Sequence, residues 1–432
     1  MSRLLLTLTC ALAALAACSQ RPAPPSYGPT ADLPPPQKSL LPTINVAKAV
    51  GWPAGAAPTP ASGLVVTRYA EGMAHPRWLY LLPNGDVLVA EASSQPSKGG
   101  GIEGLIANNM QRRGGAFSDN ANRIVLLRDS DGDGDVDLKK PFIEGLNQPM
   151  GMALVGDALY VANTDALLRF AYTPNAESIA GPGQKVLDLP YRAEGNGHWT
   201  RTLLASPDGA RLYIAIGSSS NIADSGLAAE EGRAAIWEVT LADMSHRIYG
   251  SGLRNPVGLD REPASGAIWT AVNERDMLGD NLVPDYMTSV KDGAFYGWPW
   301  SYFGQTVDTR VTPPNPQMVA RAIAPDYALG AHTASLGLHF YTADALPAKY
   351  KGGAFVGQHG SWNRSVPSGY KVVFVPFAGG APSGASEDFL TGFLNARGEA
   401  QGRPVGVATD RTGAILVADD AGDMIWRVAA AR

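Results

Sequence analysis

The sequence has 432 residues, of which 45% are hydrophobic and 17% are charged, and its formal net charge is −5. This length is enough for one large or two ordinary domains, and a mildly acidic, well-mixed charge argues against nucleic acid as a partner. The 49 glycines and 33 prolines favour a fold with many turns and short strands.

Residues 1–17 predict a lipoprotein signal peptide. Arg3 precedes an apolar run over residues 4–17 that is too short to span a bilayer as a stable helix. The run ends in Leu-Ala-Ala-Cys, which resembles the bacterial lipoprotein box, so we expect cleavage before Cys18 and its acylation. The alternative is an ordinary cleaved signal with a chance cysteine. We therefore predict an exported protein that is lipid-anchored on the periplasmic face of the outer membrane. The residue after the cysteine is Ser19 and not Asp, which by resemblance to bacterial lipoproteins favours the outer membrane.

Residues 18–62 are rich in Pro, Ala and Ser and predict a semi-extended tether, with a short ordered piece near Leu40–Val50. Cys10 would leave with the signal peptide. Because Cys18 is then the single remaining cysteine, no disulfide is expected and stability must come from the core and from metals.

From residue 63 to the C-terminus a strand–turn–strand unit recurs six times. In the first, Trp78–Leu82 and Val87–Ala90 are separated by Pro-Asn-Gly-Asp, and Asn-Gly or Asp-Gly between apolar runs is a strong hairpin signal. The other units span residues 151–162, 203–216, 257–271, 335–357 and 405–418.

Most units are followed by a third short strand, as at residues 123–127, 166–170, 235–239, 370–375 and 424–428. A repeat of roughly 50 to 70 residues is typical of propeller blades with loop insertions. We therefore predict an all-β, six-bladed β-propeller over residues 63–432, with Gly63–Tyr69 closing the ring against the last blade. The alternative is a β-sandwich or two β-domains. The insertion at 93–120 is interpreted as either a lid or a docking loop.

Several polar motifs stand at strand entrances. His198 and Arg201 precede one strand, and histidine suits a general base near neutral pH. Arg254 and Asn255 precede another, as does Arg403. Each motif alone has a structural explanation, namely loop ordering. Together, however, arginines that converge from several blades on one channel mouth repel one another unless an anion binds there.

Three further segments carry candidate groups. Residues 273–285 form an oxygen-rich loop suited to a hard cation such as calcium, or simply a solvated acidic loop. The aromatics of 296–300 are suited to lining a sugar-sized pocket or to capping the core. Residues 357–364 place Arg364 beside glycines at a strand end.

These pieces together resemble the soluble PQQ-dependent sugar dehydrogenases, and most closely their L-sorbosone dehydrogenase and pyranose dehydrogenase branch. The resemblance covers roughly residues 63–430, and its motifs are residues 147–151, 197–201, 217–221, 252–258, 296–299 and 360–364. It implies an oxidoreductase, a quinoprotein that oxidises an aldose, pyranose or sorbosone-like aldehyde and passes electrons to a respiratory quinone or cytochrome.

The resemblance also implies roles for residues. His198 matches the base that takes the proton of the sugar hydroxyl before hydride transfer to the calcium-polarised quinone. The positions that match or flank cofactor contacts are Arg77, Gln148, Arg201, Asn221, Arg254, Asn255, Arg364 and Arg403. The main-chain carbonyls of Arg275 and Asp276 match the calcium-binding turn loosely. Two departures, Ser220 and Gln401 in place of arginines, fit the sorbosone-like branch better and leave the sugar undetermined.

A separate loop, residues 129–137, places Asp129, Asp131, Asp133 and Asp137 at positions 1, 3, 5 and 9, with a further carboxylate at Asp135. This is the spacing of an EF-hand calcium loop, but position 12 is Lys140. We predict a structural calcium that pins the loop, against the alternative of a solvated acidic turn.

Two other functions compete with sugar oxidation. A metal-dependent propeller lactonase would need acidic and Asn side chains on one central metal, which the arginine-rich entrances disfavour. A non-catalytic propeller lipoprotein that binds a glycan or a protein would make His198 dispensable.

Overall fold

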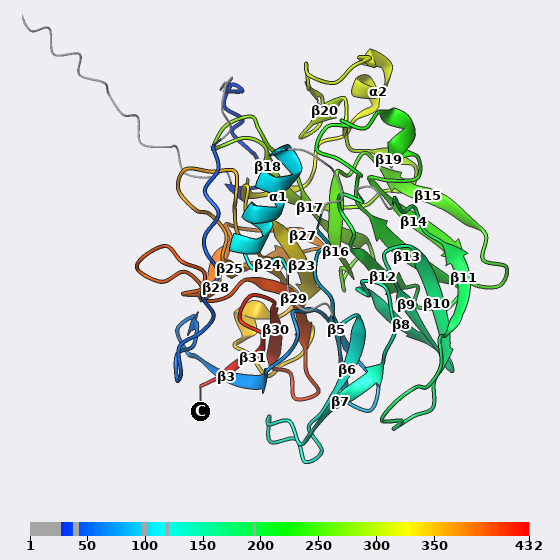
Figure 1. The fold of residues 1–432 in the computed structure, drawn as a ribbon, viewed down its shortest axis with the longest axis vertical. Helices are drawn as coiled ribbons and strands as arrows, with labels where there is room; N and C mark the ends of the chain where they lie inside the picture. Colours follow the sequence, from blue (N-terminus) through cyan, green and yellow to red (C-terminus); the bar gives the residue numbers. More distant parts are fainter. Residues whose placement is uncertain (1–26, 38–42, 97–101, 118–120, 193–195, 432) are drawn as a thin grey trace, which may run out of the picture.

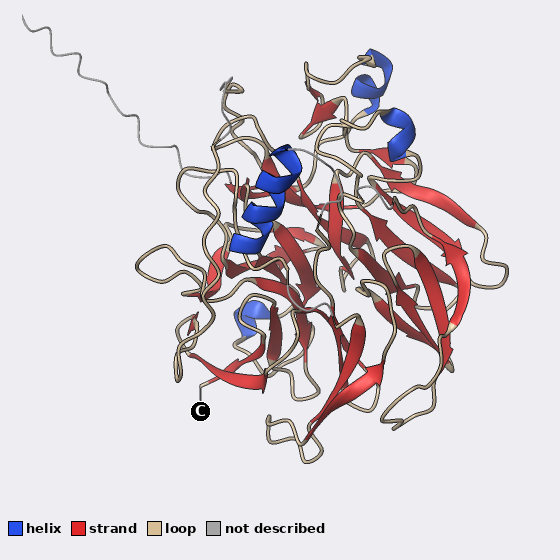
Figure 2. Ribbon diagram, in the orientation of Figure 1, coloured by secondary structure: helices blue, strands red, loops and turns tan. Residues whose placement is uncertain are grey.

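The chain folds as a six-bladed β-propeller in the computed structural model, which describes residues 27–37, 43–96, 102–117, 121–192 and 196–431 (Figure 1). Each blade is an antiparallel sheet of four strands, supplemented in three blades by a short extra strand. Helices are few and lie outside the blades (Figure 2). The prediction of an all-β propeller is therefore confirmed, whereas the predicted signal peptide and Cys18 lie outside the described residues.

The first three blades follow the chain from its innermost strand outward. Blade 1 consists of β4 (Pro76–Leu81), β5 (Val87–Glu91), β6 (Arg123–Arg128) and β7 (Leu138–Ile143). Blade 2 consists of β8 (Met152–Val155), β9 (Ala158–Ala162), β10 (Ala166–Ala171) and β11 (Gln184–Asp188). Blade 3 consists of β12 (Arg201–Ala205), β13 (Arg211–Ile216), β14 (Ala235–Thr240) and β15 (His246–Ser251), with the short β19 (Ala294–Phe295) added in parallel.

The next two blades each receive a strand from the N-terminal segment. Blade 4 consists of β16 (Asn255–Arg261), β17 (Ile268–Asn273), β18 (Pro284–Ser289) and β22 (Tyr327–Ala331), with β1 (Tyr27–Gly28) at its outer edge. Blade 5 consists of β23 (Ser335–Phe340), β24 (Ala354–Gln358), β25 (Lys371–Val375) and β28 (Glu387–Thr391), with β2 (Thr59–Pro60) at its outer edge.

Blade 6 joins the two ends of the propeller domain. Its strands β29 (Pro404–Thr409), β30 (Ile415–Asp419) and β31 (Met424–Ala430) are completed by β3 (Leu64–Glu71), which pairs with β31 from Leu64–Ala430 to Glu71–Met424. This is the ring closure that the sequence predicts. Backbone hydrogen bonds of the last blade thereby hold the two ends of the propeller domain together.

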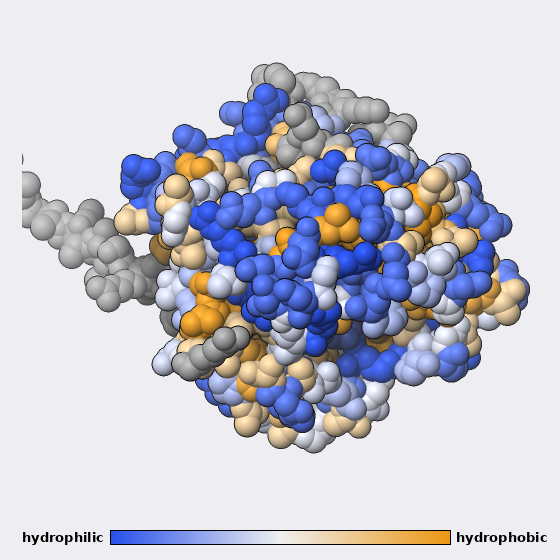
Figure 3. Space-filling model, turned by 90° about the horizontal axis from the view of Figure 1, so that it is seen from below, coloured by the Kyte–Doolittle hydropathy of each residue, from blue (hydrophilic) through white to orange (hydrophobic). Residues whose placement is uncertain are grey.

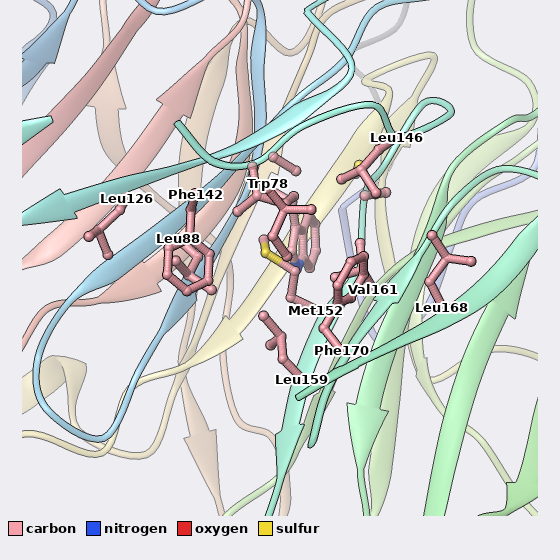
Figure 4. Close-up of a cluster of buried hydrophobic side chains, with 14 of the residues drawn as sticks. Trp78, Leu88, Leu126, Phe142, Leu146, Met152, Leu159, Val161, Leu168 and Phe170 are labelled. Atoms are coloured by element: carbon pink, nitrogen blue, oxygen red, sulfur yellow. The ribbon is translucent and has the colours of Figure 1, made fainter. Parts of the chain in front are cut away.

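Glycines let the inner strands of neighbouring blades approach closely. A Cβ on Gly258 of β16 would lie 2.6 Å from Leu338 Cβ, and one on Gly406 of β29 would lie 2.8 Å from Arg77 O. Apolar side chains fill the space between the sheets, as Trp78, Leu88, Phe142 and other residues do between blades 1 and 2 (Figure 4). The core is thus a ring of inter-blade layers.

Within the described residues, two α-helices and two small hairpins lie outside the blades. α1 (Ile102–Arg113) belongs to the insertion after β5, and α2 (Pro316–Arg321) follows the hairpin of β20 (Ser301–Tyr302) and β21 (Thr306–Val307). The second hairpin is β26 (Phe377–Ala378) with β27 (Ala381–Pro382), and short 3-10 turns span Leu227–Glu230 and Ala348–Tyr350. No helix in the described ranges is long and apolar enough to cross a membrane.

The N-terminal segment is ordered where a short ordered piece was expected, near Val50, but the order extends through residues 51–62, which were expected to be tether. Residues 43–62 lie against blades 5 and 6, and Ala47 is only 3% exposed. Backbone hydrogen bonds and a few buried side chains hold this segment, rather than an apolar repeat.

Seen from below, the described surface is mainly hydrophilic with small, separate apolar patches (Figure 3).

Candidate functional site

All six inner strands begin at the same end of the central channel, and the second strand of each blade ends there. We call this end the mouth. It gathers the loops before β4, β8, β12, β16, β23 and β29 with the loops after β5, β9, β13, β17, β24 and β30. Most of the predicted site residues lie on these loops, so the topology brings residues distant in sequence to one opening.

His198 lies directly before β12, and its orientation is fixed by the loop after β13. Its Nδ1 is 3.0 Å from Ser218 O and 3.1 Å from Ser218 Oγ. Because a carbonyl only accepts, Nδ1 carries the proton and Nε2 is left as the basic nitrogen. Desolvation, followed by the charge of Arg254, lowers the His198 pKa to about 3, so the ring is neutral at pH 7.

Glycine makes room for this histidine. A Cβ on Gly217 would lie 2.6 Å from His198 Cβ and would also clash with the side chain of Asn255. Asn255 itself is buried, and its Oδ1 has no hydrogen-bond partner. The loop after β13 is in turn held by the buried carboxylate of Glu230, which accepts from Ser219 N at 2.6 Å and Ser219 Oγ at 2.6 Å.

Arg254 connects blades 3 and 4 beside His198. Its Nη2 donates to Asn221 Oδ1 at 3.0 Å and lies 3.4 Å from Asp276 Oδ2, while Nη1 donates to Glu274 O at 2.7 Å. The Asn221 amide bridges the same two loops, because Nδ2 donates to Asp276 O and Oδ1 accepts from Asp276 N. Arg254 is therefore a buried cation whose donors are largely shared with the protein.

Asp276 is neutralised by its neighbours. Burial alone raises its pKa, but the hydrogen bond from His332 and the charge of Arg254 lower the pKa of Asp276 overall. The His332 ring spans two acceptors, with Nδ1 3.1 Å from Asp276 Oδ1 and Nε2 2.9 Å from Gly279 O. The sequence reasoning missed His332, because a lone histidine 56 residues from its partner carries no local signal.

A second charged group centres on Asp420, which follows β30. Arg77 forms a buried ion pair with Asp420, and the Nε2 atoms of His359 and His75 lie 2.9 Å and 3.3 Å from the same carboxylate. Burial raises the Asp420 pKa, but these neighbours outweigh it and hold the pKa well below its usual range. His359 lies in the 357–364 motif, whereas His75 and Asp420 were not anticipated.

Aromatic rings support two of the arginines at the mouth. The Arg77 guanidinium lies 5.4 Å from the centroid of the Trp199 ring, the residue next to His198. The Arg403 guanidinium lies 5.0 Å from the Tyr370 ring, and its Nη2 donates to Ala47 O at 3.2 Å. Arg77 thereby connects the Asp420 group to the loop that carries His198.

Not every predicted cofactor residue faces the mouth. Arg201 is 0% exposed and donates to the carbonyls of His198, Thr200 and Pro190. Arg201 was predicted to contact the cofactor. Its side chain instead holds the backbone of the loop that carries His198.

Gln148 and Arg364 are also held by main-chain carbonyls. Gln148 is buried, and its Nε2 donates to Ser93 O at 2.8 Å. Arg364 donates to Asp280 O at 2.5 Å, between the loops of blades 4 and 5. Arg364 is thus grouped with the 276–280 loop rather than with Arg77.

Unsatisfied donors mark the mouth as suited to an anion. The Nε atoms of Arg77, Arg364 and Arg403 are each buried without a hydrogen-bond partner, as are those of Arg201 and Arg275. A buried, unpartnered polar group costs roughly 1–3 kcal/mol or more when charged. An anionic ligand with several carboxylates would supply acceptors to such donors.

One of the two main-chain carbonyls expected to bind calcium, that of Asp276, already accepts a hydrogen bond from the protein. The Asp276 carboxylate is shared by His332 and Arg254, and the Asp276 carbonyl accepts from Asn221. A cation beside Arg254 would be repelled. Asp285, expected in the same oxygen-rich loop, lies within β18 and accepts from Glu274 N and Ser335 N.

The acidic loop of residues 129–137 connects β6 to β7, at the end of the channel opposite the mouth. Ligand oxygens of Asp129, Asp131 and Asp137 lie within 4.8 Å of one another, the only such acidic or histidine cluster in the described ranges. These three carboxylates also accept from backbone N–H groups of the loop, and Asp133, outside the cluster, accepts from the backbone N of Asp135. Three of the five predicted carboxylates therefore converge, far from His198.

The aromatic segment at 296–300 has a supporting role. Trp298 is 4% exposed, and its Nε1 donates to Asn221 O at 3.0 Å, so it braces the loop after β13. Trp300 borders a separate cavity of about 270 Å³ lined mainly by Pro314, Val319 and neighbouring residues. The expected sugar pocket is thus not built on Trp298.

A family model described as TrAA12-like matches residues 58–286 and 306–431, well over half of the chain. The chain belongs to the TrAA12-like family. A relative in Borreliella burgdorferi, described as an uncharacterized protein, is 29% identical over 296 residues, which is 66% of this chain and 76% of that protein.

Solved structures share the fold of this TrAA12-like chain. The holo PQQ domain of pyranose dehydrogenase from Coprinopsis cinerea has a TM-score of 0.69 and 22% identity, covering 89% of this chain and 100% of that one. The calcium structure of a Trichoderma reesei carbohydrate-active enzyme of family AA12 has a TM-score of 0.69 and 19% identity over 90% and 99%. The PQQ-bound aldose sugar dehydrogenase of Streptomyces coelicolor has a TM-score of 0.54 and 18% identity over 86% and 99%.

Proposed function

We propose that this TrAA12-like protein is an oxidoreductase that oxidises a sugar, an aldose, pyranose or sorbosone-like aldehyde, with PQQ as cofactor. The observation that carries the proposal is the mouth itself. A neutral histidine with a basic Nε2 lies one residue from Trp199, whose ring stacks beneath Arg77. Family membership and the PQQ-containing structural neighbours point the same way.

The residues at the mouth fit a cofactor with three carboxylates. Arg77 and Arg403 come from blades 1 and 6, each stacks on an aromatic ring, and each keeps a buried Nε without a partner. We assign these two arginines to the carboxylates, with Gln148, Asn221, Arg254 and Asn255 bordering the site. When bound, the ortho-quinone supplies a two-electron acceptor for the hydride of the sugar carbon.

His198 supplies the proton chemistry. Its Nε2 takes the proton of the sugar C1 hydroxyl, or of an aldehyde hydrate, as the carbon–oxygen double bond forms. Ser218 holds Nδ1 protonated, so the ring accepts the proton only at Nε2. Burial, and after it the charge of Arg254, lowers the His198 pKa, so the resting ring is neutral and Nε2 is free to accept a proton.

Calcium enters the proposal at one place, the 129–137 loop, where three carboxylates converge and attract a cation as a structural site. A calcium ion on the main-chain carbonyls of Arg275 and Asp276 would share the Asp276 carbonyl with Asn221 and lie near the charge of Arg254, which disfavours it. No step of the mechanism therefore depends on it.

The competing functions are less well supported. A lactonase would need acidic ligands around a central metal, yet the acidic cluster of the described ranges lies at the opposite end of the channel. A purely binding propeller does not explain why His198 is oriented and kept neutral. Acylation at Cys18, an outer-membrane location and a respiratory acceptor complete the proposal, and mass spectrometry of the mature N-terminus tests the first.

The decisive experiment is an activity assay with matched histidine variants. Purified protein is loaded with PQQ and calcium, and a panel of aldoses is added with a dye acceptor. We expect sugar-dependent dye reduction, lowered by roughly 10²-fold or more in His198→Ala at unchanged PQQ affinity. His246→Ala, which removes an exposed histidine stacked on Trp237, serves as the control. Unchanged turnover in His198→Ala contradicts the assigned base.

A further inference from the structure

The N-terminal residues 43–52, which we call the strap, lie across the loops of blades 5 and 6 at the mouth. In Figure 1 this blue segment runs past α1 toward β3. Arg113, the last residue of α1, accepts from Ala49 N at 2.9 Å and donates from Nε to Val46 O at 3.1 Å. The strap is thus enclosed by the blades on one side and the insertion on the other.

At blade 5 the strap binds the loop that carries Arg364. Asn45 N donates to Trp362 O and Asn45 Nδ2 to Ser365 O, both at 2.8 Å. Asn363 connects three segments, since its Nδ2 donates to Thr43 O at 2.6 Å and its Oδ1 accepts from Met277 N at 2.7 Å. The strap therefore contacts the loop that is also hydrogen-bonded to the 276–280 turn.

At blade 6 the strap reaches an arginine assigned to the cofactor. The carbonyl of the buried Ala47 accepts from Arg403 Nη2, and this arginine is 5% exposed. Lys48 O accepts from Ala400 N and Val50 N donates to Ala400 O, both at 2.8 Å. The guanidinium of Arg403 is therefore enclosed between the strap and the ring of Tyr370.

Trp52 fixes the end of the strap to Asp419, the residue before Asp420. Its Nε1 donates to Asp419 Oδ2 at 2.6 Å, and its ring packs edge-to-face on Trp426 with centroids 5.1 Å apart. Asp419 Oδ1 also accepts from Arg403 N at 2.7 Å, and the next residue is Asp420, the partner of Arg77. One buried carboxylate thus links the strap to the backbone of Arg403.

We propose that the strap is a wall of the PQQ site, and that Trp52, acting through Asp419, is a positioning residue for Arg403. The inference rests on the proposed function. An ordered strap holds Arg403 in place, so the cofactor binds more tightly to the strap-closed state. By linkage, the bound cofactor must then suppress local opening of the strap by the same factor.

Limited trypsin digestion measures this coupling. Lys48 is exposed in the middle of the strap, and Lys185 is an exposed lysine on β11, an outer strand of blade 2. Saturating PQQ should slow cleavage after Lys48 by about 5-fold or more and leave cleavage after Lys185 unchanged. Equal rates after Lys48 with and without bound PQQ overturn the inference while leaving the proposed function intact.

A variant pair provides an independent measurement. Trp52→Phe keeps the aromatic packing but removes the N–H to Asp419, and we expect about 10-fold weaker PQQ binding by fluorescence titration. Trp300→Phe removes an indole hydrogen bond to Pro313 O away from the site and should bind PQQ like the wild type. Equal affinity in all three proteins overturns the role of Trp52. If the wild type binds no PQQ, the proposed function fails, and the inference fails with it.

Discussion

Replacing Asp420 by Asn should destabilise the folded protein more than any surface charge change. The Asp420 side chain is 1% exposed and is the shared partner of Arg77, His75 and His359. Breaking a buried ion pair from one side costs roughly 3–5 kcal/mol, because the remaining charge stays buried without its counterion. With an unfolding entropy of roughly 2 cal/mol/K per residue over roughly 370 folded residues, this loss lowers Tm by about 4–6 °C.

The assay is thermal unfolding of the apo protein, with Asp388→Asn as a matched control. Asp388 pairs with Lys371 at the surface, so its removal costs about 0–1 kcal/mol. The native pKa of Asp420 is depressed, so its contribution is full above the unfolded pKa of about 4 and shrinks as pH falls further. A Tm for Asp420→Asn within 1 °C of wild type at pH 7 refutes the reasoning.

Three further predictions test other parts of the molecule. Because the His198 pKa is lowered to about 3, we expect turnover to show no protonation limb between pH 5 and 8, and a limb near the ordinary histidine pKa of about 6.5 would contradict this. In Asp131→Asn, calcium should no longer raise Tm, while the PQQ affinity stays unchanged; altered affinity would argue against a remote structural site. In Gly258→Ala, a Cβ 2.6 Å from Leu338 Cβ should cost roughly 1–3 kcal/mol in chemical denaturation, and an unchanged midpoint would show that the inner strands can separate.

The sequence predicted the blades well because their signals are local. Apolar runs around glycine-containing turns, two of them Asn-Gly or Asp-Gly, identified the hairpins of all six blades, and the closing strand at residues 63–69 is confirmed as β3. The third strand of blade 4, β18, was missed, and its first two residues were interpreted as the end of an oxygen-rich loop. Residues 51–62 were interpreted as tether, because an isolated anchor such as Trp52 leaves no periodic pattern.

The site was predictable only in outline. Glycine-flanked arginines and histidines at strand entrances identified the mouth, but their partners lie far away in sequence. Arg77 and Asp420 are 343 residues apart, and no composition or spacing rule joins them. The same limit explains Arg201, whose position beside His198 suggested ligand contact although its side chain folds back onto backbone carbonyls.

The central claim is that arginines from separate blades form one receptor for a multiply charged anion. Titration of the apo protein with PQQ at two salt concentrations tests it most directly, with Arg403→Gln in parallel. We predict micromolar or tighter binding by the wild type that weakens at high salt, and at least about 10-fold weaker binding by the variant. Binding that is absent, or that is equal in both proteins, would contradict the account.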